Sequence, residues 1–339
     1  MDKINLLNDY SSIAHPNVLD AIREAGERRF PCYGNDEETS AAADTVRHLI
    51  GRTVADVHFL VGGTQANMTA VAAFLRPHEA VISPQSAHIN IHETGAIESV
   101  GHKILTVPAE KGKIDAEDVI AVVKAHTDEH MVKPKMIMIS QASELGTVYT
   151  QKELFALRDV CDKYRLYLYI DGARLGPALA SEACDIELSE LANLADAFYI
   201  GGTKNGLLFG EALVICNPEL GADFRFHIKQ RGALLAKGFL LGIQFRTILE
   251  DGLFFELARR ANSLAARLAD GLKATDIPLL ADAESNQVFA CVDDETLSRL
   301  EEHVLFEHWG CKREEGTPIR FVTSWQTTEA EIDAILKML

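Results

Sequence analysis

Short apolar runs alternate along much of the chain with longer segments in which apolar residues recur every three or four positions. The runs lie at residues 57–62, 80–83, 103–108, 135–140, 166–172, 197–202 and 211–216. Each is typical of a strand that is buried on both faces. Helices are predicted between them at residues 64–76, 116–126, 151–164 and 187–195. The alternation predicts an α/β domain with a mostly parallel sheet from about His58 to Cys216.

The pattern changes after Pro218. A long helical region is predicted over residues 221–250, with a break at Asp251 and Gly252 and another helix through about Lys273. The last part alternates strands and helices, with strands at 277–281, 286–292 and 319–325 and helices at 295–309 and from 328 onward. We interpret this part as a smaller α+β domain.

The chain length of 339 residues and the apolar content of 47% suffice for one large core and one smaller core. We expect a large ligand-binding domain over residues 1–250, which includes the N-terminal segment, and a small C-terminal domain over residues 251–339. The sequence contains no low-complexity segment or flexible linker between them. Continuous helix is therefore expected to join the two domains.

Charge and cysteine content restrict the possible partners. A formal net charge of -17 argues against binding to nucleic acid or to an anionic membrane surface, because both need clustered Lys and Arg. The six cysteines include no CxxC pair, which favours reduced thiols in the cytoplasm. The N-terminal sequence MDKINLLNDY has no basic region followed by a long apolar run, so neither secretion nor a membrane span is expected. A small-molecule ligand is the expected partner.

A carboxylate ends one of the predicted buried strands, in the sequence LYLYIDGARLG. Ligands of open α/β sheets gather at the carboxyl ends of strands, and a buried carboxylate there needs a cation. Asp171 is therefore a candidate partner for a positive group, and Arg174 adds an anion-binding side chain at the same place. The alternative is an ordinary helix cap, since Asp followed by Gly is common in turns.

A lysine follows the next predicted strand, in YIGGTKNG. Burial between glycines would lower the pKa of Lys204 and make its amine nucleophilic. Most lysines are solvated surface charges, so this turn alone is weak evidence for a nucleophilic lysine. An Asp at one strand end and a Lys at the next is, however, the arrangement expected for pyridoxal phosphate, with Lys in the Schiff base and Asp at the ring nitrogen.

An earlier turn, in FLVGGTQANMTAV, is a candidate phosphate site. Gly62, Gly63 and Thr64 end a strand and open a helix, whose free N–H groups and positive dipole end favour an anion. The turn matches neither a Walker loop nor a full GxGxxG. Its alternative interpretation is a plain strand-turn-helix junction.

Histidines in SAHINIHETG have the spacing of neighbours on a helix, but HExxH is incomplete because Ala96 stands where a third partner would be needed. No metal site is therefore expected. His88 is a candidate to lie flat on a cofactor ring, or else a satisfied core histidine. His130 lies in a polar loop and faces solvent on composition alone.

These motifs occur in an order and spacing that span nearly the whole chain: NDYS, YGNDE, GGTQAN, SAHINIHETGA, QASELGTVY, DGARL, GGTKNG and IRFVTSW. Taken together they resemble the threonine aldolase and β-eliminating lyase branch of pyridoxal-phosphate enzymes, and in particular the low-specificity L-threonine aldolases. The resemblance implies the aspartate aminotransferase fold, which is fold type I, with a large domain and a smaller C-terminal domain.

The resemblance assigns the cofactor contacts. It implies that Lys204 is the Schiff-base lysine, that Asp171 binds the ring nitrogen and that His88 stacks on the ring. The phosphate would be held at the first glycine turn, and further cofactor contacts would come from the second turn, from Arg174 and from two basic residues, one reaching from a neighbouring subunit. The expected cofactor-binding residues are Gly62, Gly63, Thr64, His88, Asp171, Arg174, Thr203, Lys204, Lys229 and Lys237, with Lys229 as the residue from the neighbour.

The resemblance also assigns the substrate contacts and the reaction. Arg174 and Arg320 would grip the α-carboxylate, Tyr33 would be donated across a homodimer or homotetramer, and His130 would lie near the β-hydroxyl group. The implied reaction is reversible cleavage of β-hydroxy-α-amino acids, such as L-threonine and L-allo-threonine, to glycine and an aldehyde. His88 and His130 remain alternative catalytic bases.

The chain departs from the commoner family pattern at LLND, where many relatives have Ser-Asp, and at QASELG, where many have Glu-Asn-Thr-His. Both changes alter walls of the substrate pocket. The nearest alternative function is β-elimination from another amino acid by the same lysine and aspartate. A dinucleotide-dependent oxidoreductase would need a GxGxxG turn, which is absent from the sequence. A non-catalytic protein of the same fold would not need the lysine, the aspartate and both arginines.

Overall fold

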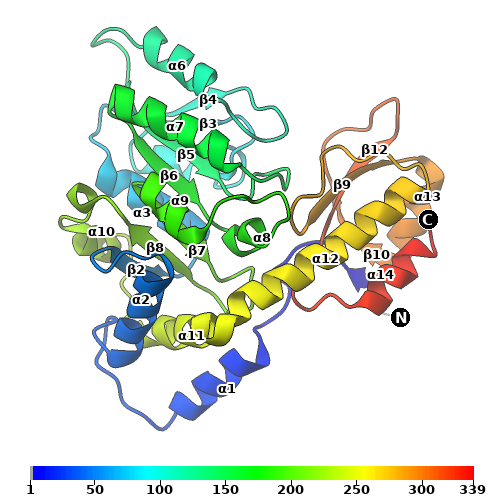
Figure 1. Cartoon of the computed structure of the whole chain (residues 1–339), viewed down its shortest axis with the longest axis horizontal. Helices are drawn as coiled ribbons and strands as arrows, with labels where there is room; N and C mark the ends of the chain where they lie inside the picture. The colour runs from blue at the N-terminus through cyan, green and yellow to red at the C-terminus, as the bar shows by residue number, and fades with distance from the viewer. Residues whose placement is uncertain (1–2) are drawn as a thin grey trace.

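Seven strands form the central sheet of the computed structural model, which describes residues 3–339 (Figure 1). Strand β8 is antiparallel to both of its neighbours, and the remaining neighbouring pairs are parallel. The expected mostly parallel α/β sheet is confirmed. The strands in spatial order are β2 (Asp56–Leu60), β8 (Glu211–Ile215), β7 (Ala197–Gly201), β6 (Tyr167–Asp171), β5 (Lys133–Ser140), β3 (Glu79–Pro84) and β4 (Ile104–Val107).

Helices cover both faces of this sheet, as the continuous apolar runs predict. Leu168 and Ile170 of β6 belong to one apolar cluster, and Tyr169 between them belongs to the cluster on the other face. Every residue of β3, β7 and β8 is buried. The first cluster includes residues of α2 (Glu37–Leu49), α7 (Gln151–Tyr164), α9 (Leu188–Leu194) and α11 (Phe239–Leu249), and the second includes residues of α3 (Gly63–Phe74) and α10 (Phe224–Gln230).

Local signals fix the helix ends. The side chain of Thr150 caps α7 by accepting from the backbone N–H of Glu153, and Glu153 accepts in return from the backbone of Thr150. The helix ends at Tyr164, because the C-cap residue Arg165 has a left-handed φ of 57°. Helices α3, α6 (Ala116–Ala125), α7 and α9 agree with the predicted ranges to within two residues. The other helices before β7 are α1 (Pro16–Ala25), α4 (His88–Ile91), α5 (Ala96–Ser99) and α8 (Leu175–Leu179).

The long helix α12 (Leu253–Ala274) connects the two parts of the molecule (Figure 1). Phe254 and Leu257 near its start pack into the core of the large sheet, whereas Leu264 and Leu268 pack into a third cluster. The predicted break before α12 is confirmed, since Asp251 has a φ of 54° and forms part of the short 3-10 helix η2 (Glu250–Gly252). The division into domains at residues 250 and 251 stays a prediction.

The third cluster surrounds a small antiparallel sheet of β11 (Glu307–His308), β12 (Thr317–Val322) and β9 (Gln287–Val292). It also contains residues of α13 (Asp294–His303) and α14 (Glu329–Leu336). The first strand of the chain, β1 (Ile4–Asn5), pairs in parallel with β10 (Val304–Leu305) beside this sheet. The N-terminal segment is therefore tied to the C-terminal part of the chain.

Two helix predictions are wrong. The region from 221 to 250 is not one helix, because an irregular loop, in which Gly232 has a φ of 68°, separates α10 from α11. The short 3-10 helix η1 (Pro218–Leu220) precedes α10. The helix predicted at 295–309 ends at His303. After it, Val304 and Phe306 are buried and Leu305 is 40% exposed, which is the two-residue period of a strand.

No helix among residues 3–339 is both long and apolar enough to cross a membrane.

Candidate active site

The carboxyl ends of β2, β5, β6 and β7 lie at one edge of the sheet and open into a cavity of about 580 Å³. Residues that follow these strands line the cavity together with the N-terminal segment and the end of the small sheet. The pocket thus lies where ligands of open α/β sheets bind. It contains most of the predicted site residues: Gly62, Gly63, Thr64, His88, Asp171, Arg174, Thr203, Lys204 and Arg320.

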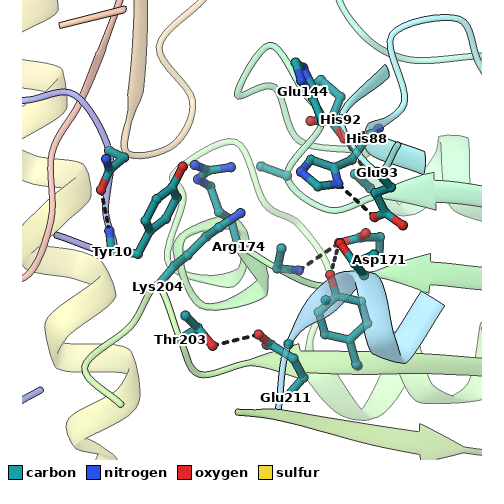
Figure 2. A pocket seen from close by; sticks show the side chains of 18 of the residues that line it. Tyr10, His88, His92, Glu93, Glu144, Asp171, Arg174, Thr203, Lys204 and Glu211 are labelled. Atoms are coloured by element: carbon teal, nitrogen blue, oxygen red, sulfur yellow. Dashed lines mark hydrogen bonds and ion pairs between the residues drawn. The ribbon is translucent and has the colours of Figure 1, made fainter. Parts of the chain in front are cut away.

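Lys204 projects into the pocket from a tight turn after β7 (Figure 2). The Thr203 hydroxyl holds the turn closed, because it donates to Glu211 Oε1 at 2.8 Å and accepts from the backbone N–H of Gly210 at 3.0 Å. Burial and the neighbouring Arg174 guanidinium lower the pKa of Lys204 below its ordinary value. A larger fraction of the amine is then unprotonated at neutral pH, which suits a nucleophile.

Asp171 is buried at the end of β6 and accepts three hydrogen bonds. The donors are the Tyr199 hydroxyl at 2.5 Å, the Asn67 amide at 2.9 Å and the backbone N–H of Ala173 at 3.0 Å. Among residues 3–339, no Lys or Arg forms an ion pair with this carboxylate. A buried carboxylate with hydrogen-bond donors and no cation of its own is suited to a cationic ligand group.

His88 is held by Glu93, whose side chain is fully buried (Figure 2). Nδ1 of the His88 ring lies 2.8 Å from Oε1 of Glu93, and the side-chain amide of Asn67 donates to the same oxygen at 2.9 Å. Burial alone would lower the pKa of His88, but the hydrogen bond to Glu93 and the carboxylates of Glu144 and Asp171 outweigh it and raise that pKa. The ring is therefore both oriented and made more basic by its neighbours.

Both predicted carboxylate-binding arginines line the pocket, and each already has an acidic partner. Arg174 forms a two-pronged pair with Asp9, with Nε–Oδ2 at 2.7 Å and Nη2–Oδ1 at 3.1 Å. Asp9 is fully buried, and Arg174 and Lys204 lower its pKa although burial alone would raise it. Arg320 is paired with Glu307 across the small sheet.

The first glycine turn lies against the pocket at the start of α3. Gly62 is the N-cap residue, and a Cβ added to it would meet no protein atom within 4 Å. Gly62, Gly63 and Thr64 line the pocket at this end of a twelve-residue helix, where free backbone N–H groups and the helix dipole favour an anion. Glu211 also lines the pocket, and burial raises its pKa to about 8.

Four predicted residues lie outside the pocket of this chain. His130 is exposed in the loop before β5, with its backbone N–H bonded to the side chain of Asp128. Tyr33, Lys229 and Lys237 are exposed, and Lys229 Nζ lies 4.8 Å from the centre of the Tyr33 ring. The backbone N–H of Tyr33 donates to the carbonyl of Ala236, the residue before Lys237, so Tyr33, Lys229 and Lys237 lie close together. The assigned roles of all four residues stay predictions.

Several residues in or directly behind the pocket could not be assigned from the sequence. Asn67 stands three residues after Thr64 in GGTQAN, at a helical spacing, and this was the available signal for it. The QASELG segment supplies Glu144, which accepts from the Ser140 hydroxyl at 2.8 Å and from the backbone N–H of His88 at 3.2 Å. Among residues 3–339, no group of three or more His, Cys, Asp or Glu is placed to hold a metal ion.

The fold and the site define a class of protein, the fold-type I pyridoxal-phosphate enzymes. A lysine and a carboxylate end neighbouring parallel strands, and a glycine turn opens a helix opposite them. The fold agrees with that of a Thermus thermophilus aspartate aminotransferase, with a TM-score of 0.70 at 17% identity over 99% of this chain and 91% of that chain. The expected fold type is confirmed.

The chain belongs to the β-eliminating lyase family, whose model matches residues 20–295. The low specificity L-threonine aldolase of a Pseudomonas species is 35% identical over 332 residues, which cover 96% of this chain and 93% of that protein. A threonine aldolase of Leishmania major has a similar structure, with a TM-score of 0.97 and 42% identity over 98% of each chain. The resemblance predicted from the motifs is confirmed.

Proposed function

We propose that this chain is a pyridoxal 5′-phosphate-dependent aldehyde-lyase. It cleaves β-hydroxy-α-amino acids, L-threonine and L-allo-threonine among them, to glycine and an aldehyde. The observation that carries the proposal is the placement of Lys204 and of the cation-free Asp171 in one cavity with two arginines. The names of the relatives, which are low specificity L-threonine aldolases, support the same reaction.

The residues present fit this cofactor. Lys204 would hold its aldehyde carbon, Asp171 its protonated ring nitrogen and the start of α3 its phosphate, while His88 would cover the ring. Bound there, the cofactor supplies an electron-accepting ring when the Cα–Cβ bond of the substrate breaks. The carboxylate of Asp171, which accepts hydrogen bonds but has no Lys or Arg partner among the described residues, is the feature that best fits a protonated ring nitrogen.

Arg174 and Arg320 would bind the substrate α-carboxylate. Among the described residues no hydrogen bond uses Nη1 of Arg174, so this nitrogen can meet a ligand while Asp9 holds the other two. His88 would accept the proton of the β-hydroxyl group through Nε2, because Nδ1 is bonded to Glu93. We favour His88 over His130 as the base, since His88 alone of the two lines this pocket.

The replacement Lys204→Ala tests this proposal. The variant should lose the visible absorption of lysine-bound cofactor and more than about a thousandfold of the turnover, whereas Lys124→Ala, on the surface helix α6, should keep both. Retention of absorption and turnover by the Lys204 variant would disprove the cofactor assignment. The products distinguish the reactions: acetaldehyde from threonine supports aldol cleavage, and pyruvate with ammonia from serine supports β-elimination instead.

We also propose that the active site is shared between copies of this chain, in a homodimer or homotetramer located in the cytoplasm. The Lys and Arg residues that line the pocket in the described chain are Arg174, Lys204 and Arg320, and none belongs to the first glycine turn. Exposed Lys229 and Lys237 of a second copy would supply positive charge at that end. The six cysteines are free, in agreement with a reducing compartment.

Mixed assemblies test the sharing. Subunits with Lys204→Ala and subunits with Lys229→Ala should be inactive or weakened alone. If each site draws on two chains, every hybrid dimer has one intact site of two, so a freely exchanged 1:1 mixture should regain about a quarter of the activity of the unmodified protein. Hybrids that show only the average of the two parents would argue for sites built within one chain.

A further inference from the structure

The guanidinium of Arg320 is surrounded on several sides within this chain. Glu307 lies directly opposite it in the register of β11 and β12 and forms an ion pair with Nη2. Gln287 Oε1 lies 3.2 Å from Nη1, and the centre of the Trp309 ring lies 4.8 Å from Cζ. The proposed substrate-carboxylate site therefore already contains a carboxylate.

The two acid–arginine pairs of the pocket differ in how firmly the acid is held. Asp9 has no exposed side-chain surface and accepts from Arg174 Nε, Arg174 Nη2 and Asn286. The Glu307 side chain is 36% exposed, and Arg320 is its one side-chain hydrogen-bond partner among the described residues. Glu307 also stands on a strand of two residues. Glu307 can therefore rotate toward solvent, whereas Asp9 cannot leave without exposing a buried charge.

Electrostatics favour an exchange of carboxylates at Arg320. Burial and the neighbouring Arg174 lower the pKa of Arg320, and the Glu307 carboxylate does not fully offset them. The guanidinium thus still attracts negative charge. Two carboxylates on one guanidinium repel each other, so an arriving carboxylate competes with Glu307 for Nη2.

We propose that Glu307 is a displaceable counter-ion for Arg320: it pairs with the arginine in the substrate-free pocket and turns outward when an α-carboxylate binds. Glu307 therefore weakens substrate binding and keeps Arg320 aligned on Trp309 between turnovers. This inference rests on the proposed function, because it requires that Arg320 bind the substrate carboxylate. Glu307 acts through Arg320 and is a positioning residue.

The test measures ligand binding to the cofactor-loaded protein. Glycine, a product of the proposed reaction, is titrated while the absorbance of the bound cofactor is followed, and acetate is used as a competitor without an amine. Glu307→Gln and Glu307→Ala should each bind glycine and acetate roughly fivefold more tightly. The KM for threonine should fall by a similar factor, with a smaller change in kcat. Glu301→Gln is the matched control, since this exposed acid pairs with His308 on the same strand, outside the pocket.

Unchanged or weaker binding in both Glu307 variants would overturn the inference, as would equal tightening in the Glu301 control. Arg320→Ala separates this failure from failure of the proposed function. If Arg320→Ala abolishes glycine binding while the Glu307 variants behave as the parent, Arg320 is the carboxylate site and Glu307 is not its competitor. If Arg320→Ala binds glycine normally, the carboxylate assignment itself is wrong, and the inference fails with it.

Discussion

Asn67 and Asp171 stand 104 positions apart in the sequence, and Nδ2 of Asn67 lies 2.9 Å from Oδ2 of Asp171. The same amide nitrogen lies 2.9 Å from Glu93, which in turn holds His88. One amide group thus bonds to two buried carboxylates and links the proposed ring-nitrogen partner to the proposed base. Changes at Glu93 should therefore alter the chemistry of His88 without removing any group that contacts substrate.

Glu93→Gln should lower the pKa of His88, because the amide keeps the size of the side chain but loses the charge that stabilises the imidazolium. A base must be neutral to act, so the acid limb of the profile of kcat/KM against pH should move to lower pH. The rate at the plateau should fall by roughly tenfold, since a weaker base takes the proton less readily. Glu98→Gln, at an exposed position of α5, is the control. An acid limb that stays in place would show that Glu93 does not tune His88.

Alanine at the two glycines of the first turn should have different effects. At Gly62 the new Cβ meets no protein atom within 4 Å, so the cofactor-free protein should unfold at an unchanged denaturant concentration while cofactor affinity falls at least about tenfold. At Gly63 the new Cβ would lie 2.8 Å from the Tyr199 hydroxyl, which must then move away from Asp171. That variant should also lose about 1–2 kcal/mol of stability. Absorbance titration measures the cofactor affinity, and urea unfolding measures the stability. Identical behaviour of the two variants would contradict the assignment of this turn as the phosphate site.

His58 should make the protein sensitive to acid. Burial lowers its pKa to about 4 from an ordinary value of 6.5, and its Nε2 atom has no hydrogen-bond partner among the described residues. Between these two pH values the unfolded chain binds a proton that the folded chain does not, so stability falls as the pH drops from 6.5 to 4. The loss should be about 2.5 kcal/mol. His58→Phe, which can keep the contact with the Phe224 ring, should remove this dependence in urea unfolding at the two pH values.

The exposed His48 provides the comparison, because His48→Gln should leave the pH dependence as it is. If His58→Phe and the parent protein lose stability in parallel between pH 6.5 and 4, another group accounts for the acid sensitivity.

The sequence predicted the large sheet well because each strand is buried on both faces and each helix repeats its apolar positions locally. The prediction of a helix over residues 295–309 failed at His303, since the alternation of Val304, Leu305 and Phe306 covers too few residues to outweigh the preceding helical pattern. What fixes this stretch is pairing with β1 at the other end of the chain. Local periodicity carries no information about such a partner.

Some residues of the candidate site could likewise be predicted from the sequence, and others could not. Lys204, Asp171 and the first glycine turn were predictable because each ends a predicted strand and their order matches a known family. Asp9 and Glu307 were not, because an acidic residue in the sequence does not reveal its cation. Asp9 and Arg174 are 165 positions apart, and Glu307 was expected on a helix, where it could not face Arg320.

The pairing of β1 with β10 has a consequence for synthesis on the ribosome. The chain emerges from its N-terminus, so the segment carrying Asp9 is made first, yet the strand that anchors it appears only after Val304 has been added. The central sheet can form in the meantime, with Arg174 and Lys204 at its edge. A nascent chain would therefore hold an assembled sheet beside an unfinished pocket, and the cofactor site would close last, when β10 becomes available to pair with β1.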